Sequence, residues 1–107
     1  MSETNVKDAL MRALHAAYPE GLFWRAGASP YARAGVPDIL GVVDGHAIGI
    51  EVKKPGKLKN LSPTQDRFGK EMIAAGGCWI LVDSVELALD LLRGWLRGES
   101  EIRRNDP

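Results

Sequence analysis

Cysteine and histidine are scarce in this sequence of 107 residues. The single cysteine, Cys78, excludes a disulfide within the chain. The two histidines, His15 and His46, do not form a zinc-ligand spacing with that cysteine. A disulfide-stabilised secreted fold and a zinc module are therefore not indicated, and we expect an intracellular, cytoplasmic protein.

Long apolar runs and repeats are also missing from the sequence. No stretch approaches the roughly 18 apolar residues of a membrane span, and the polar, acidic N-terminus does not resemble a signal peptide. We therefore expect no membrane association. The chain is long enough to bury one core, so we predict a single domain over residues 1–98 and a polar tail over residues 99–107.

Net charge is absent as well, because 14 basic residues balance 14 acidic ones, and this is not the bulk signature of a nucleic-acid-binding protein. The distribution of the basic residues is more informative. They flank the acidic residues discussed below, where they would attract phosphate, although a solvated lysine loop would look the same. The basic residues concerned, all candidates for DNA binding, are Arg25, Arg33, Lys54, Lys57 and Lys59.

The stretch from Gly35 to Lys53 contains the most informative pattern. Asp44-Gly45 separates two apolar runs, which is the strongest short-range hairpin signal and favours a two-residue type I′ turn. This turn predicts strands over residues 38–43 and 46–53, with Asp38 directly opposite Glu51. Because side chains alternate between the faces of a strand, Lys53 is expected on the same face as Glu51.

The predicted pair of carboxylates needs relief, since like charges directly opposed at a Cβ distance of about 4.5–5.5 Å destabilise a sheet. A shared proton would relieve the repulsion and raise one pKa. A divalent cation would also do so, because Mg²⁺ suits one or two carboxylates together with water and phosphate oxygens. Lys53 favours the cation, because an ammonium beside a metal site can hold an attacking water and offset charge on a phosphoryl group.

The first helix is predicted over residues 3–17, with Ser2 as its N-cap. Its apolar residues recur at helical spacing, and Glu3 extends this stripe by one turn. A carboxylate on the buried edge of a helix suggests a functional role. The alternative is an ordinary first-turn acid that the helix dipole favours.

Residues 22–25 predict a short strand, and residues 26–36 predict a loop of a length that is often functional. In this loop Tyr31 is a candidate for stacking on a base and Arg33 for pairing with a phosphate. The alternative for each is an ordinary surface residue. Gly35 and Pro37 are expected to shape the backbone that presents Asp38.

The second helix is predicted to begin at Ser62-Pro63-Thr64-Gln65, which is a capping-box pattern with proline at the first helical position. Gln65 then has two possible roles. It reaches back to the Ser62 amide as a local cap, or it lines the site, because Phe68 and Met72 share its face and place it toward the interior.

The continuous apolar run over residues 78–82 predicts a buried central strand, with Cys78 as a small buried hydrophobe. A third helix is expected from about Asp83-Ser84 to about Arg97, and its broad apolar face indicates a dimer contact. The predicted order is α-β-β-β-α-β-α. It defines an α/β fold in which a mixed sheet with a central antiparallel hairpin is flanked by helices.

Two short motifs in this order, Pro37-Asp38 and Glu51-Val52-Lys53, resemble the motif of the PD-(D/E)XK nuclease superfamily. Three further features make the chain similar to the VRR-NUC branch of that superfamily. They are Glu3 in the first helix, the run Gly35-Val36-Pro37-Asp38, and Gln65 at the start of a later helix. The resemblance extends from about residue 2 to about residue 92. Each motif is weak alone, but their order and the hairpin register make the combination more specific.

The resemblance implies a Mg²⁺- or Mn²⁺-dependent deoxyribonuclease with the PD-(D/E)XK core. Asp38 and Glu51 would bind the metal, with the Val52 carbonyl as a further ligand. Glu3 would bind it directly or through water. Lys53 would orient or activate the attacking water and support the scissile phosphate. Gln65 would help to hold water or substrate.

The family also includes stand-alone members similar to Holliday junction resolvases. This implies a homodimer that cuts branched DNA, and a phage-like protein in a bacterial or phage-infected cell. Two rival interpretations remain. One is a DNA-binding module with this fold and no catalysis, and the other is a protein unrelated to nucleic acid in which Glu51 and Lys53 form a surface ion pair.

Overall fold

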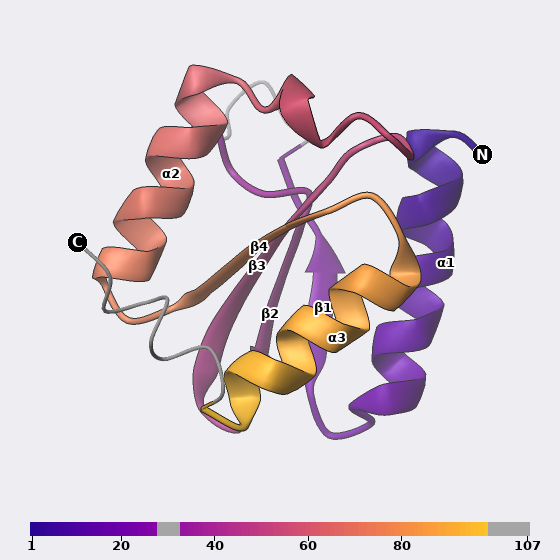
Figure 1. Cartoon of the computed structure of the whole chain (residues 1–107). Helices are drawn as coiled ribbons and strands as arrows, with labels where there is room; N and C mark the ends of the chain where they lie inside the picture. The colour runs from indigo at the N-terminus through magenta and orange to yellow at the C-terminus, as the bar shows by residue number, and fades with distance from the viewer. Residues whose placement is uncertain (28–32, 99–107) are drawn as a thin grey trace.

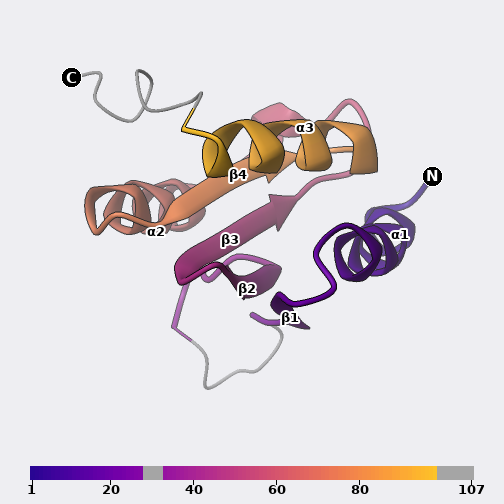
Figure 2. The same cartoon turned by 90° about the horizontal axis from the view of Figure 1, so that it is seen from below.

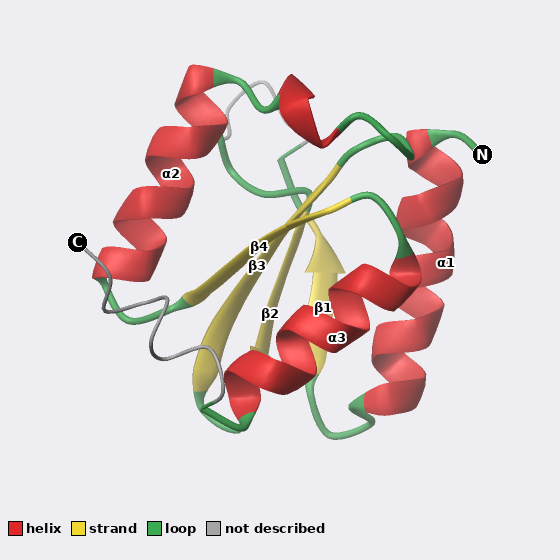
Figure 3. Cartoon of the chain, viewed as in Figure 1, coloured by secondary structure: helices red, strands yellow, loops and turns green. Residues whose placement is uncertain are grey.

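The structure, a computed structural model, describes residues 1–27 and 33–98 (Figures 1 and 3). The order α-β-β-β-α-β-α is confirmed, with one additional 3₁₀ helix in the lysine-rich loop. Tyr31 and the tail over residues 99–107 lie outside the described residues. The elements are α1 (Glu3–Ala17), β1 (Leu22–Arg25), β2 (Ile39–Val43), β3 (His46–Val52), η1 (Leu58–Asn60), α2 (Pro63–Ala74), β4 (Cys78–Val82) and α3 (Val85–Leu96).

The described strands form one mixed sheet in the order β1-β2-β3-β4. The pairs β1–β2 and β2–β3 are antiparallel, whereas β4 joins β3 in parallel. The prediction that residues 78–82 form a central strand is therefore wrong, since β4 lies at an edge of the sheet. It is nevertheless apolar throughout because helices cover it, and Gly69 of α2 lets that helix approach Trp79 closely.

The helices lie on both faces of the sheet, with α1 and α2 on opposite sides and α3 over β4 (Figures 1 and 2). Buried side chains of α1, α3 and the alternating strand positions form one core. The apolar side chains of α3 that are not fully buried pack against this same core. The broad apolar face of α3 is therefore accounted for largely within the chain, which removes the reason for assigning a dimer contact to it. The buried core residues are Val6, Leu10, Leu14, Phe23, Ile39, Val43, Ile48, Ile50, Val52, Cys78, Ile80, Val82, Ala88 and Leu92.

Exposed apolar side chains gather elsewhere. Among the described residues, the large apolar side chains that are exposed are Met1, Leu22, Trp24 and Val42. Leu22 pairs with Val42 in the sheet, and Trp24 lies two positions along β1 on the same face. The apolar surface left open is thus on β1 and β2 rather than on α3.

Local contacts fix the segments that surround the acidic pair. Ser2, Ser62 and Ser84 cap the three α-helices through their hydroxyl groups, as their side-chain chemistry favours. Gly35 has a φ of +84°, and a Cβ atom there would collide with the Thr64 carbonyl. Glycine therefore allows the loop before Asp38 to contact the first turn of α2. No helix within residues 1–27 and 33–98 is long and apolar enough to cross a membrane.

Candidate active site

The hairpin of β2 and β3 positions the two acidic residues. Asp44 and Gly45 both have positive φ, 50° and 79°, as a type I′ turn requires. The pairing of Val43 with His46 continues to Ile39 opposite Ile50, so the predicted register of the strands is confirmed. Asp38 precedes Ile39 and Glu51 follows Ile50. The turn therefore brings the two carboxyl groups to the same end of the hairpin.

Asp38 is held by hydrogen bonds from two directions. Its Oδ2 atom accepts a hydrogen bond of 2.8 Å from the Val52 amide, and its backbone carbonyl accepts one of 2.8 Å from the Ala26 amide. Its Oδ1 atom lies 3.2 Å from the Nζ atom of Lys7 in α1. The backbone of Asp38 is thus held by the residue that follows β1, and its carboxylate is held by β3 and α1, so it is oriented before any ligand arrives.

Glu51 is the one buried charged residue among the described residues, with an exposed fraction of 1%. Its Oε2 atom is buried and has no hydrogen-bond partner. Burial, the charge of Asp38 and a hydrogen bond with Asp38 raise the pKa of Glu51 to about 8, although Lys53 and Lys7 act in the opposite direction. In the absence of a cation, the pair therefore retains a proton at neutral pH.

The carboxyl oxygens of Asp38 and Glu51 are ligands that fit a hard divalent cation. The buried Oε2 atom of Glu51 lacks a partner, and a cation between Glu51 and Asp38 would supply one while removing their repulsion. The described residues contain no group of three or more His, Cys, Asp or Glu side chains placed to hold a metal. Two carboxylates with water and substrate oxygens are a common set for Mg²⁺, so this smaller set of donors is sufficient.

Glu3 is not brought into this pair. Its side chain is 43% exposed, which differs from the buried edge expected from the helical stripe, and its Oε1 atom lies 3.4 Å from Lys7 Nζ. Because the Lys7 ammonium also contacts Asp38, it lies between the two carboxylates. A metal-binding role for Glu3 stays a prediction.

Gln65 forms the predicted cap and also contacts Lys53, while its role in holding water or substrate stays a prediction. Its Oε1 atom accepts a hydrogen bond from the Ser62 amide at 2.9 Å, which completes the capping box. The same oxygen accepts one from Lys53 Nζ, also at 2.9 Å. The start of α2 therefore fixes the position of the Lys53 ammonium, which also acts electrostatically on Glu51.

The predicted DNA-binding residues lie in separate parts of the structure. Arg25 lines a pocket together with Lys7 and Asp38, whereas Arg33 lines a second pocket between the loop before β2 and α2. Arg33 pairs with Glu71 at 2.6 Å and lies over the Phe68 ring. Lys54, Lys57 and Lys59 are exposed in the segment after β3, and Tyr31 lies outside the described residues.

Two basic residues that line these pockets were not predicted from the sequence. Lys7 contacts Asp38, and Arg67 lines the same pocket as Arg33. The only sequence feature that would have indicated Lys7 is its position four residues after Glu3, where oppositely charged side chains pair on a helix. Arg67 has no comparable feature, because its neighbours are set by how the loop meets α2.

Two of the solved structures that share this fold are described as VRR_NUC domains. One, described as a VRR_NUC domain protein, matches with a TM-score of 0.70 and 16% sequence identity, covering 91% of this chain and 89% of that one. The other, described as a VRR_NUC domain, matches with a TM-score of 0.68 and 24% identity, covering 85% and 94%. No known protein-family model and no curated protein matches the sequence. The chain therefore has the fold of VRR_NUC domains, and the fold class implied by the resemblance is confirmed.

Proposed function

We propose that this protein is a Mg²⁺- or Mn²⁺-dependent deoxyribonuclease that hydrolyses phosphodiester bonds in branched DNA. The observation that carries the proposal is the buried Glu51 carboxyl beside Asp38, with one oxygen that has no partner. Burying a carboxyl oxygen that has no hydrogen-bond partner costs stability, and a bound cation would offset that cost. Basic residues line one pocket that includes Asp38 and a second pocket beside α2, and they would attract the DNA backbone.

The residues of the chain divide the chemistry between them. Asp38 and Glu51 would hold the cation, with the Val52 carbonyl as the further ligand that the resemblance implies. A bound cation supplies a polarised phosphate oxygen and a water of lowered pKa. Lys53, fixed by Gln65, would orient the attacking water and offset the charge that develops on the phosphate.

Cleavage of labelled DNA tests the proposal. The substrates are a single strand, a duplex, a 5′ flap, a splayed arm and a four-way junction, each with Mg²⁺, Mn²⁺ or EDTA. We expect metal-dependent cutting that ranks the branched substrates first. Asp38→Asn should reduce the rate by more than about 100-fold, the upper end of what is lost with an outer-shell partner of a metal.

Asp44→Asn is the matched control for this experiment. It removes the same charge from an exposed turn of the same hairpin, and asparagine tolerates the positive φ found there. It should cut DNA at the wild-type rate. Binding of one substrate by the wild-type protein without cutting would replace the nuclease by a non-catalytic DNA-binding module. The absence of both binding and cutting would reject the nuclease and the DNA-binding module alike.

From the resemblance alone, we also propose that the enzyme acts as a homodimer, so that two sites cut two strands of a junction. Light scattering of the purified protein should then give about twice the 11.7 kDa mass of one chain. A monomer at the concentrations that support cleavage would reject paired cutting. That result would leave phosphodiester hydrolysis itself in place.

A further inference from the structure

A positive charge already lies against the carboxylate proposed to bind metal. The Lys7 ammonium is 3.2 Å from Asp38 Oδ1 and 3.4 Å from Glu3 Oε1, and the Lys7 side chain is only 18% exposed. A lysine is a compact charge on a flexible four-carbon stem. It therefore neutralises Asp38 in the metal-free protein, and it can leave that carboxylate without movement of the helix.

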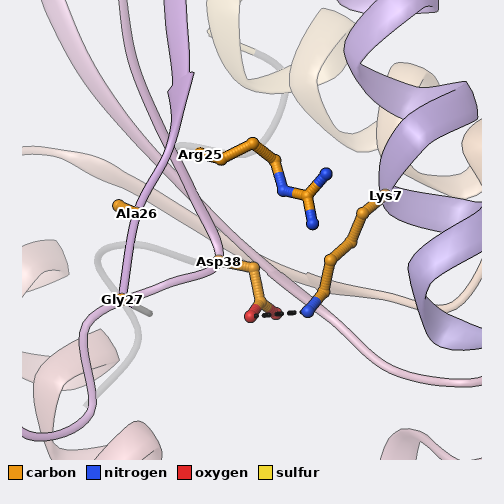
Figure 4. A pocket seen from close by; sticks show the side chains of 5 residues that line it. All are labelled: Lys7, Arg25, Ala26, Gly27 and Asp38. Atoms are coloured by element: carbon orange, nitrogen blue, oxygen red, sulfur yellow. Dashed lines mark ion pairs between the residues drawn. The ribbon is translucent and has the colours of Figure 1, made fainter. Parts of the chain in front are cut away.

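An open pocket of about 260 Å³ lies next to this contact. It is lined by the Lys7, Arg25 and Asp38 side chains together with Ala26 and Gly27, and the two basic groups converge on it (Figure 4). Arg25 also pairs with Asp8 at 2.8 Å, which holds the guanidinium in place. Asp38 is the acidic residue of this lining. Once another cation neutralises it, the charged groups of the lining are Lys7 and Arg25, whose remaining carboxylate partners, Glu3 and Asp8, are not among the lining residues.

We propose that Lys7 has two anionic partners in turn: Asp38 in the metal-free protein, and a DNA phosphate in the Arg25 pocket once a divalent cation occupies the acidic pair. This inference rests on the proposed metal-dependent nuclease. A divalent cation and the ammonium cannot both lie against Asp38 without repulsion. Metal binding therefore releases Lys7 toward the pocket, where it meets a phosphate together with Arg25.

Two measurable consequences follow from this exchange. Lys7 competes with the metal, so its removal tightens metal binding in the absence of DNA. Lys7 also links the two ligands, because metal binding prepares the phosphate subsite and a bound phosphate draws Lys7 away from Asp38. Such coupling is reciprocal. Metal should therefore raise the affinity for DNA by more in the wild-type protein than in a variant without this charge.

The first test measures metal binding alone, by calorimetry with Mn²⁺ at fixed pH and ionic strength. Lys7→Met keeps the length of the stem and removes the charge, whereas Lys7→Arg keeps the charge. We expect Mn²⁺ affinity about five-fold tighter in Lys7→Met than in wild type, and no tighter than wild type in Lys7→Arg. Unchanged or weaker binding by Lys7→Met would overturn the competition. If the methionine variant is unstable, the arginine variant still tests the competition, because tighter Mn²⁺ binding with the charge retained would contradict it.

The second test measures DNA affinity by fluorescence anisotropy with and without Ca²⁺ at matched ionic strength, with the oligonucleotide checked on a gel for cutting. Ionic strength is matched because salt alone weakens phosphate contacts. We expect Ca²⁺ to raise the wild-type affinity by at least about five-fold and the Lys7→Met affinity by less than about two-fold. An equal gain in both proteins would overturn the phosphate contact of Lys7.

Arg93→Met is the control for loss of one positive charge. Arg93 is exposed on α3 and pairs with Asp90, and its charge acts on Tyr18 beyond the C-terminal end of α1, whereas Lys7 lies in the first half of that helix. It should leave Mn²⁺ affinity and the Ca²⁺ effect unchanged. These measurements are of binding only. A protein that shows the exchange but cuts no DNA would reject the proposed function and retain the inference.

Discussion

Replacing Lys53 by methionine is expected to reduce the single-turnover cleavage rate by about 10²–10³-fold, the loss typical of one donor that stabilises transition-state charge. The Lys53 ammonium is half-buried beside the acidic pair and donates to Gln65 Oε1 at 2.9 Å. Because Gln65 is itself fixed by the Ser62 cap, the ammonium is oriented before the substrate binds. Its loss should therefore affect the chemical step more than DNA affinity.

Lys54→Met is the matched comparison, because it removes the same charge one position further along the chain. The Lys54 side chain is exposed. Among the described residues, it is not one of the lysines whose charge acts on Glu51. We expect weaker DNA binding and a smaller salt dependence, with a rate at saturating DNA within about three-fold of wild type. Equal losses of rate in the two variants would show that Lys53 acts only through general charge.

Lys53→Met must keep its fold and its metal site for this interpretation. Its Mn²⁺ affinity, measured by calorimetry, is expected to change only modestly. Lys53 lowers the pKa of Glu51, so its removal makes the competing proton bind more tightly, but it also removes a positive charge that repels the cation. Loss of all metal binding would instead assign Lys53 to the assembly of the site rather than to the reaction.

The sequence predicted those parts of the site that depend on local rules. Asp44-Gly45 selects one turn, and one turn selects one register, so the approach of Asp38 to Glu51 followed from two residues. The capping box at Ser62 placed the start of α2 in the same way, because a cap is formed by neighbours in the chain. Side-chain alternation then put Lys53 beside Glu51.

The predictions that were wrong or missing concern packing between segments that are distant in the sequence. The apolar run of β4 predicted burial correctly, but a strand covered by helices at a sheet edge has the same composition as a central strand. Periodicity along α1 identifies which face of the helix packs against the core. It does not identify which residues of other segments its polar side chains will contact. The contact of Lys7 with Asp38 depends on where that helix crosses the sheet, and so the sequence did not indicate it.

Glu51→Gln is expected to stabilise the metal-free protein at alkaline pH while abolishing metal binding. The raised pKa of Glu51, about 8 against 4.5, means that the folded protein keeps a proton that the unfolded chain releases. This contribution to stability is fully present below pH 4.5 and is lost as the pH rises through about 8. Glutamine has no proton to lose, so the variant lacks this decline.

Unfolding by denaturant in EDTA, followed by tryptophan fluorescence between pH 6 and pH 9, measures the effect. At the alkaline end we expect the free energy of unfolding of Glu51→Gln to exceed that of wild type by roughly 2–4 kcal/mol. The difference between the two proteins cancels the pH effects of every residue that both contain. Glu20→Gln, a change at an exposed turn residue, should give the wild-type profile.

Metal should reverse the order of stability. Mn²⁺ binds the ionised pair, so it stabilises wild type and releases about one proton, and its affinity should rise about ten-fold per pH unit from pH 6 before levelling off above pH 8. Glu51→Gln should gain nothing from Mn²⁺. A metal-free wild type whose stability relative to the variant stays constant between pH 6 and pH 9 would falsify the assignment. The Glu51 carboxyl would then be ionised without metal, and the unpartnered oxygen would no longer indicate a cation site.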